Sequence, residues 1–292
     1  MKILIADRLL KGRPNADWKE GWEFFYAFNE LGHQADIAGP DCPIDDKYIP
    51  EIADSYDFIL ITENYWIHKT PTPWKFWYWD KIKTFKIFWA VDTHLVDYTE
   101  WVKEAGINLV ACNNRIDLNK FQCPSFWLPY GVSERHFGVI NNKVKKRDVA
   151  FIGSLNTSER RSIVKELRAE HISAYGRNYV REIQASKICV NAPISYDLNA
   201  KTLEIMAAGS FLLTRACPFL KMLINSPFLD CMMWLDLEDL SVKIHHFLKN
   251  DHYRETLVTL AREEVLKNHT WRNRAQEVLA KFVVCRDTKV PS

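Results

Sequence analysis

The feature that most restricts the fold of this 292-residue chain is a repeated alternation of short apolar runs with helix-like segments. In the first half, strand-like runs occur at 2–6, 35–38, 58–62, 85–91, 108–111 and 125–128. Helix-like segments lie between them, at about 18–31, 47–56, 73–83, 97–105 and 115–120. Strands that alternate with helices form a parallel, doubly wound sheet. We therefore predict a first α/β domain over residues 1–140.

The alternation stops at residues 138–147, which are polar, basic and without periodicity, and then begins again. Strand-like runs follow at 148–152, 172–175, 187–191, 211–214 and 232–235. Helix-like segments follow at about 159–169, 179–186, 200–208, 238–249, 251–267 and 271–284. The sequence thus predicts a linker and a second α/β domain over 141–292. In each domain the ligand crevice is expected at the carboxyl ends of the strands.

Composition narrows the class of protein. The formal net charge is +2 and 47% of the residues are hydrophobic, which is typical of a globular protein. Such a balance does not by itself indicate nucleic acid, although a local basic patch can act within a neutral total. Seven cysteines without a C-x-x-C pair are typical of reduced thiols. No run reaches the ~18 apolar residues of a membrane span, and the N-terminus does not resemble a signal peptide. We expect a cytoplasmic protein.

The first candidate site is the turn that follows the strand at 148–152. Gly153 and Ser154 end the strand, and Arg160 and Arg161 lie in the first turn of the next helix. A glycine at a strand end lets a ligand approach the backbone, and the N–H groups at a helix start bind phosphate. The two arginines add charged donors for a diphosphate. The alternative is a tight turn followed by two solvated arginines.

The second candidate site is the polar loop that enters the helix at 200–208. Asn199 can cap this helix, Lys201 lies in its first turn, and Glu204 lies one turn further along. The lysine can reach a phosphate, and the carboxylate can accept both hydroxyls of a ribose. The alternative is that Lys201 and Glu204 lie on an exposed helix face and bind nothing.

Several motifs occur in an order that resembles the C-terminal domain of CgeB-like glycosyltransferases, within the group 1 (GT4-like) family. They are the run 151–154 with Arg160-Arg161, the run 186–191, the run 199–214 and the run 269–274. The segment 128–132 is similar to the end of the first domain in these enzymes. The resemblance implies a GT-B fold, in which two Rossmann-like domains face each other across a cleft. It also implies that the last helix returns to the first domain.

The resemblance assigns roles in donor binding. Glu204 would hold the nucleotide ribose, and Arg160 or Arg161 together with Lys201 would hold the diphosphate. The turn at Gly153 and the side chain of Thr214 would line the donor pocket.

The resemblance also bears on cofactors and stereochemistry. Enzymes of this fold usually need no metal, because helix dipoles and basic side chains balance the leaving diphosphate. The sequence has no D-x-D triplet in a suitable loop, so we expect no metal and no cofactor besides the nucleotide-sugar co-substrate. One departure concerns Tyr196, which stands where many retaining relatives have a second glutamate eight residues before Glu204. Retention of configuration is therefore not implied.

The third candidate site follows the strand at 85–91. Asp92 and His94 stand two residues apart where this strand ends, and they should face the crevice of the first domain. In an inverting enzyme Asp92 can accept the proton of the acceptor hydroxyl as general base. In a retaining enzyme either residue can position the sugar instead. The alternative is a helix-capping aspartate beside a surface histidine.

The fourth candidate site is the segment 68–83, which mixes aromatic and basic residues. We predict acceptor binding by Lys69, Trp74, Lys75, Trp77 and Trp79. Aromatic rings stack on sugars and bases, and lysines follow phosphates. The alternative is an amphipathic helix with its aromatic residues in the core and its lysines outside.

These sites favour transfer of a sugar from a nucleoside-diphosphate sugar to a hydroxyl of a glycan, a lipid-linked sugar or a protein. An alternative is a phage-type enzyme that glycosylates hydroxymethylated pyrimidines in DNA, because such an enzyme takes its base out of the stack and aromatic residues help to hold it. A second alternative is a non-catalytic sugar-nucleotide or glycan-binding protein on the same fold. A third is a nucleotide-sugar epimerase of GT-B shape.

Overall fold

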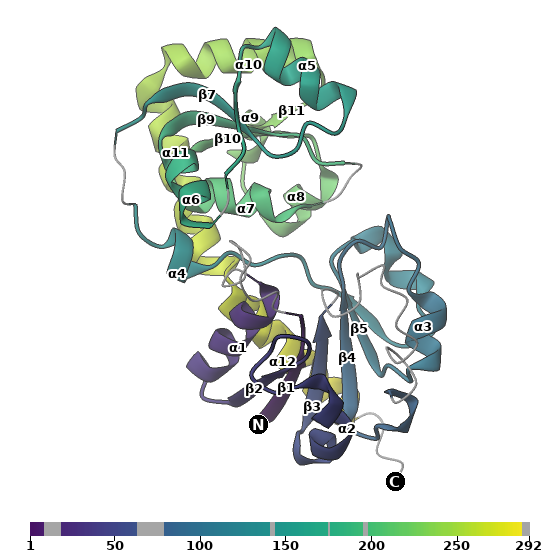
Figure 1. Ribbon diagram of the computed structural model, residues 1–292. Coiled ribbons are helices and arrows are strands. Elements are labelled where there is room, and N and C mark those ends of the chain that lie inside the picture. Colours follow the sequence, from purple (N-terminus) through teal and green to yellow (C-terminus); the bar gives the residue numbers. More distant parts are fainter. Residues whose placement is uncertain (9–18, 63–78, 141–143, 175, 195–197, 288–292) are drawn as a thin grey trace. The chain divides into compact units, whose positions relative to one another are not determined.

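The computed structural model describes residues 1–8, 19–62, 79–140, 144–174, 176–194 and 198–287. The chain divides into two compact units (Figure 1). Unit 1 comprises residues 1–129 and 271–292, and unit 2 comprises residues 130–270. All seven cysteines lie in the described ranges, and none of them forms a disulfide. Among these ranges, no helix is long and apolar enough to cross a membrane.

Unit 1 is built on a six-stranded parallel sheet of order β2-β1-β3-β4-β5-β6. Its strands are β1 (Lys2–Ala6), β2 (Gln34–Ala38), β3 (Phe58–Thr62), β4 (Phe85–Ala90), β5 (Leu109–Cys112) and β6 (Ser125–Trp127). The helices include α1 (Glu20–Glu30), α2 (Ile49–Ile52), α3 (Thr99–Glu104) and α12 (Trp271–Asp287). The strands are mostly apolar because helices cover both faces of the sheet, which is the usual reason for apolar runs in parallel sheets.

Alternate strand residues of unit 1 point to opposite faces. Phe58 and Trp89 face α1 and α12, where Trp89 packs edge-on against Phe24 and Trp271 with ring centroids 5.7 and 5.4 Å apart. Phe88 points the other way and packs against Trp101 of α3 at 4.7 Å. The last helix of the chain therefore completes the core of unit 1.

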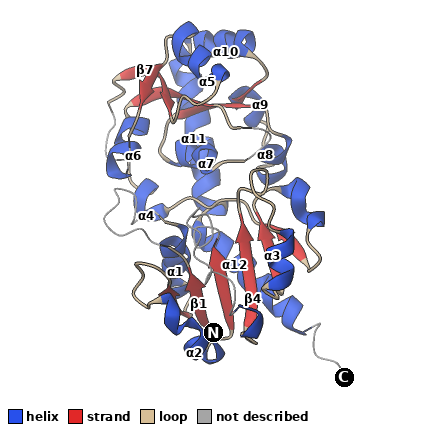
Figure 2. Ribbon diagram, turned by 45° about the vertical axis from the view of Figure 1, so that its right-hand side comes forward, coloured by secondary structure: helices blue, strands red, loops and turns tan. Residues whose placement is uncertain are grey.

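Unit 2 is built on a five-stranded parallel sheet of order β11-β10-β9-β7-β8. Figure 2 shows the strands of the protein in red and the helices packed around them in blue. Its strands are β7 (Arg147–Ile152), β8 (Glu170–Ile172), β9 (Ser186–Asn191), β10 (Phe211–Arg215) and β11 (Met233–Trp234). Its helices are α4 (Glu134–Phe137), α5 (Ser158–Glu166), α6 (Gly176–Gln184), α7 (Ala200–Ala207), α8 (Pro218–Leu223), α9 (Leu229–Met232), α10 (Leu237–Lys249) and α11 (Asp251–Asn268). The two-domain α/β fold predicted from the sequence is confirmed.

The strand orders locate a switch point in each sheet. In unit 1, β1 pairs with both β2 and β3, and in unit 2, β7 pairs with both β8 and β9. The chain therefore leaves the central strand in opposite directions, which opens a crevice beyond the carboxyl ends of these strands. Candidate ligand-binding residues in unit 2 should follow β7 and β9.

The first unit ends at Pro129, eleven residues before the boundary expected from the sequence. The segment after it packs on unit 2, where the Val132 amide donates to the carbonyl of His269 at 2.9 Å. The Arg262 guanidinium donates to the carbonyls of Phe137 and Gly138 at 3.0 and 2.6 Å. These contacts give hydrogen-bond partners to backbone groups of residues 130–138. Because this segment has no apolar pattern of its own, the sequence does not show that it belongs to unit 2.

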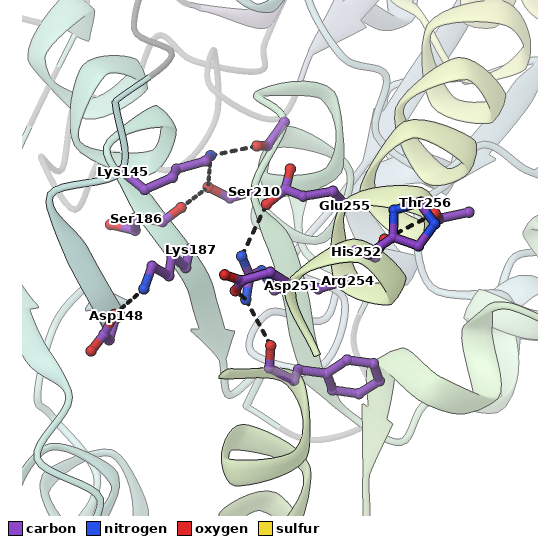
Figure 3. Close-up of polar contacts among 12 residues, drawn as sticks. Lys145, Asp148, Ser186, Lys187, Ser210, Asp251, His252, Arg254, Glu255 and Thr256 are labelled. Carbon is purple, nitrogen blue, oxygen red and sulfur yellow. Dashed lines mark hydrogen bonds and ion pairs between the residues drawn. The ribbon is translucent and has the colours of Figure 1, made fainter. Parts of the chain in front are cut away.

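Lys145, from the segment expected to be a linker, lies at the amino-terminal edge of the sheet in unit 2 (Figure 3). Lys145 Nζ donates to the Gly209 carbonyl at 2.7 Å, and the Ser210 hydroxyl donates to the Ser186 carbonyl at 2.7 Å. Lys187, at the start of β9, pairs with Asp148 at 2.7 Å. The described part of 138–147 is therefore a fixed part of unit 2 rather than a linker.

Candidate functional site

The carboxyl end of β7 makes a turn that only glycine can form without strain. Gly153 has φ +146°, and a Cβ atom at this position would lie 2.9 Å from the Lys201 ammonium. Glycine is the residue that accepts such a backbone and such a close approach. The predicted Gly153 turn is thus placed directly against the first turn of α7.

Lys201 is a half-buried cation at this turn. Burial lowers the pKa of its ammonium, the neighbouring Arg160 lowers it further, and Glu204 raises it. Within the described ranges, the ammonium makes no hydrogen bond or ion pair. A charge withdrawn from water without a partner is costly, so the site is electrostatically suited to an anion.

Arg160 has a different place from the one expected. Its side chain is largely buried, and Nε and Nη2 both donate to the Ala192 carbonyl, at 3.0 and 2.8 Å. Nη1 donates to Asn156 Oδ1 at 2.9 Å and to Ser154. Arg160 therefore ties the loop after β7 to the loop after β9. Arg161 is exposed, with Nη1 on the Leu155 carbonyl at 3.0 Å, and it is the arginine of the pair that faces solvent.

A second network fixes the start of α7. Asn199 caps the helix, its Oδ1 accepting from the Thr202 amide. Asn191 Nδ2 donates to Asn199 Oδ1, to Thr202 Oγ1 and to Thr214 Oγ1 at 3.1, 3.1 and 3.2 Å. Thr214 is 1% exposed, so it does not line an open pocket as expected from the sequence. Its hydroxyl supports Asn191 instead.

Glu204 has a partner that sequence reasoning missed. The Tyr179 hydroxyl, from α6, donates to Glu204 Oε2 at 2.7 Å. Burial and the adjacent carboxylate raise the pKa of Tyr179 well above its ordinary value, so the phenol remains a donor. Tyr179 is held in turn by edge-on packing against Phe137, at 6.4 Å between ring centroids. The structure thus brings Gly153, Lys201 and Glu204 together at one edge of the sheet.

In unit 1, Asp92 follows β4 and opens a tight turn. Its backbone carbonyl accepts from the amides of Leu95 and Val96 at 2.8 and 3.0 Å. The next helix starts at Thr99, whose amide donates to Asp97 Oδ1 at 3.0 Å. Asp92 is therefore not the helix cap that the sequence left open as an alternative. Its carboxylate is half-buried at the carboxyl edge of the sheet.

His94 lies in the same turn and is also half-buried. Its Nδ1 has almost no exposed surface, and among the described residues it has no hydrogen-bond partner. A buried ring nitrogen without a partner is a group that a ligand or water can satisfy.

Asp7 is a second carboxylate at this edge of unit 1, and sequence reasoning missed it. It follows β1, is fully buried, and accepts from the amides of Gly21 and Arg8 at 2.6 Å each. Burial, and then the charge of Glu20, raise the pKa of Asp7 to about 6, although hydrogen bonds from Thr62 and Arg8 oppose the rise. An acid at the end of the first strand is the signal that would have singled it out.

We predict that Asp7 makes the stability of the protein fall as the pH rises from 4.5 to 7.5. The pKa of Asp7 in the folded protein lies above the value of 3.8 usual for aspartate. The protonated carboxyl therefore stabilises the fold at low pH, and this contribution is lost as the pH rises through about 6. Each unit of pKa change corresponds to about 1.4 kcal/mol. Urea unfolding should therefore show that the stability of an Asp7→Asn variant, relative to that of the unaltered chain, increases by about 2 kcal/mol between pH 4.5 and pH 7.5.

An Asp45→Asn variant is the matched control for this titration. Hydrogen bonds and the charge of Lys47 lower the pKa of Asp45, so its carboxyl titrates below the range measured. Its effect on the free energy of unfolding should be the same at pH 4.5 and pH 7.5. An equally constant difference for Asp7→Asn would contradict the assignment.

The predicted acceptor segment is only partly described. Lys69, Trp74, Lys75 and Trp77 lie outside the described residues. Trp79 is fully buried in the core of unit 1, where it begins a 3-10 helix at Trp79–Lys81. Lys86 Nζ donates to the carbonyls of Trp79 and Ile82. A ring with no exposed surface cannot stack on an acceptor, so the prediction for Trp79 was wrong. Lys81 and Lys83, by contrast, are exposed.

Comparison with known proteins agrees with this geometry. Residues 141–280 match the family model described as glycosyl transferase-like. No curated protein sequence matches the chain significantly.

Three solved structures illustrate the likeness of fold. A DNA-modifying β-glucosyltransferase has a TM-score of 0.68 and 14% identity, and the match covers 97% of this chain and 100% of that one. An α-glucosyltransferase solved with UDP and a 13-mer DNA has a TM-score of 0.67 and 12% identity, with coverage of 97% and 99%. The sucrose-phosphate synthase of Thermosynechococcus elongatus has a TM-score of 0.59 and 14% identity, with coverage of 99% and 100%.

The fold and the matched domain together define the class of this protein. It is a glycosyltransferase of the GT-B type, built from two Rossmann-like units and carrying a glycosyl transferase-like domain in the second. The predicted fold and the predicted transfer of a sugar from a nucleotide-sugar are confirmed at this level.

Proposed function

We propose that this enzyme transfers a sugar from a nucleoside-diphosphate sugar bound by unit 2 to a hydroxyl group on DNA. One observation carries the donor assignment: the Lys201 ammonium, half-buried and without a hydrogen bond or ion pair among the described residues, lies against Gly153 and one helical turn from Glu204. A diphosphate supplies the charge that this cation lacks, and a ribose supplies hydroxyls for the carboxylate. A thermal-shift comparison of UDP-, GDP- and ADP-sugars tests it, and stabilisation by none of them would oppose it.

Further contacts to the donor diphosphate are expected from the start of α7 and from Arg161. The N–H groups that begin α7 point toward the same edge as Lys201, which suits a phosphate oxygen. Arg161 can add a charged donor from solvent, whereas Arg160 shapes the loop between them. The order of the motifs in unit 2 supports the finer assignment to CgeB-like enzymes within the group 1 family.

For the chemical step we propose that Asp92 accepts the proton of the acceptor hydroxyl. The hydroxyl oxygen then forms a bond to the anomeric carbon as the bond from that carbon to the diphosphate breaks. The nucleoside diphosphate leaves with the electron pair, and Lys201 and the start of α7 balance its charge. His94 stands beside Asp92, where it can orient the acceptor or the sugar.

DNA is the acceptor favoured by the structural relatives. Two of the three are described with DNA as the material modified or bound, and both match more closely than the sucrose-phosphate synthase does. Lys81 and Lys83 are exposed just before β4, at the end of the strand opposite Asp92, where they can bind the phosphate backbone away from the reacting hydroxyl. A hydroxymethylated pyrimidine presents the primary hydroxyl that the reaction requires. A glycan acceptor is the competing proposal.

We predict that binding to duplex DNA with hydroxymethylated pyrimidines weakens steeply with salt, because each neutralised phosphate releases a counterion. Replacing Lys81 and Lys83 with alanine should reduce the slope of log K against log salt by roughly one unit per lost contact. The control replaces Lys165 and Lys249, two exposed lysines of unit 2, and should leave the slope closer to that of the unaltered chain. If the protein does not bind DNA at low salt but transfers sugar to an oligosaccharide, the acceptor is a glycan and not DNA.

A further inference from the structure

A buried carboxylate joins the loops that follow β4 and β5 in unit 1. Asp117 is 3% exposed and lies in a 3-10 helix at Arg115–Lys120. Its Oδ2 accepts from Thr93 Oγ1 at 2.6 Å and from Asn114 Nδ2 at 3.0 Å, and its Oδ1 pairs with Lys120 Nζ at 2.6 Å. Both oxygens therefore have partners, as a buried carboxylate requires.

Thr93 is the residue between the two candidate catalytic side chains. It is 7% exposed, and its hydroxyl points into the protein toward Asp117. A hydroxyl that donates to a carboxylate at a distance of 2.6 Å makes a short, charge-assisted hydrogen bond. Asp92 and His94 are bonded directly to Thr93 through its two peptide groups. Holding Thr93 in place therefore also holds the Cα atoms from which the side chains of Asp92 and His94 extend.

Thr93 links the turn after β4 to the loop after β5. Residues 91–98 form neither helix nor strand, and the turn is closed by the amides of Leu95 and Val96 on the Asp92 carbonyl. Those bonds define the shape of the turn but do not attach it to the loop after β5. The Thr93–Asp117 bond makes that attachment, beside the bond from the Asn113 amide to the Ala90 carbonyl at 2.8 Å.

We infer that Asp117 and Thr93 are positioning residues for the transfer reaction, holding Asp92 and His94 in place without touching the substrate. This inference rests on the proposed function, because it assigns the chemical step to Asp92. Reacting groups displaced by about 1 Å lose roughly 100-fold in rate, so a partial loss of the anchor should cost about tenfold. The cost should fall on kcat and not on donor binding, because the donor residues belong to unit 2.

The experiment compares Thr93→Val, Thr93→Ser and Asp117→Asn in the full chain. Valine keeps the shape of threonine and removes the donor, whereas serine keeps the donor. Initial rates are measured with UDP-glucose as the donor probe and hydroxymethylated duplex DNA as the acceptor, and donor affinity is measured by calorimetry. We expect Thr93→Val to lower kcat by about tenfold or more with donor affinity unchanged, and Thr93→Ser to restore most of the activity.

The matched control is Thr99→Val. Thr99 makes the same kind of bond, from Oγ1 to Asp97 Oδ1 at 2.7 Å, six residues further along the chain and on the surface. Its loss should leave kcat within about twofold of the unaltered chain. A fall in kcat equal to that of Thr93→Val would show a general effect of loosening the loop and would overturn the inference.

The remaining outcomes are also decisive. Unchanged kcat in Thr93→Val overturns the inference while leaving the proposed function intact. If Thr93→Val does not fold, Asp117→Asn replaces it, since the amide keeps the size of the side chain and loses the charge. Absence of turnover by the unaltered chain with UDP-, GDP- and ADP-glucose, on DNA and on oligosaccharides, overturns the proposed function and this inference with it.

Discussion

Replacing Asp92 with asparagine should lower kcat by about 100-fold or more and leave the affinity for the nucleotide-sugar near its original value. The amide has the same shape but cannot accept a proton at neutral pH. The turn should survive, because it is closed by the backbone carbonyl of Asp92 and not by the side chain. Donor affinity should survive because Lys201 and Glu204 belong to the other unit.

Rapid-quench measurement of product formation at saturating donor separates the chemical step from product release. The matched control is Asp97→Asn, a nearby exposed aspartate that accepts from the Thr99 amide and should affect the start of α3 alone. If the Asp92→Asn variant keeps kcat within a few-fold of the unaltered enzyme, Asp92 is a residue of the turn and another group receives the proton.

The fold of this protein was predictable because its strands are buried on both faces. β3 (Phe58–Thr62) is buried at every position, so it forms an unbroken apolar run that needs no knowledge of its neighbours. α10 was equally predictable, since its residues form an amphipathic pattern and Asp236 caps its first turn by accepting from the Asp239 amide. The same local rule failed at 138–147, where long-range hydrogen bonds of Lys145 and Arg262 fix a segment that has no pattern of its own.

The candidate site divides in the same way. The approach of Gly153 to Lys201 was predictable because one ends a strand and the other opens a helix, so both positions depend on local order. The role of these residues and of Glu204 in donor binding stays a prediction. Tyr179 was not predictable, because it reaches Glu204 from α6, 25 residues earlier in the chain. The Thr93–Asp117 bond is equally non-local, and burial of Trp79 depends on packing against the sheet, which an aromatic-basic pattern does not reveal.

Replacing Glu204 with alanine should weaken binding of the donor by roughly tenfold or more. The structural reason is that Tyr179 holds one carboxylate oxygen at 2.7 Å, so the group is already oriented before the ligand arrives. A hydrogen bond to a charged group contributes about 1.5–3 kcal/mol. Glu204→Gln should weaken binding less, because the amide oxygen can still accept from Tyr179 or from one ribose hydroxyl.

The substitution should also change how donor binding depends on pH. Burial lowers the pKa of Lys201 and Glu204 raises it, so removing the carboxylate lets that pKa fall further. Only the protonated ammonium attracts a diphosphate. Donor affinity in the Glu204→Ala variant should therefore decline at a lower pH than in the unaltered enzyme. Calorimetric titration with UDP-glucose at pH 7 and pH 9 measures both effects.

The control for this titration is Glu166→Ala, which removes an exposed carboxylate at the end of α5 in the same unit. It should change neither the affinity at pH 7 nor its decline toward pH 9. Tyr179→Phe adds a second check, because it keeps the charge of Glu204 and removes only the bond that orients it. It should weaken donor binding by a smaller factor than Glu204→Ala and leave the pH at which affinity declines nearly unchanged. If Glu204→Ala binds UDP-glucose as tightly as the unaltered chain does, and the chain does bind it, then the ribose is held elsewhere and Glu204 serves only to support Tyr179.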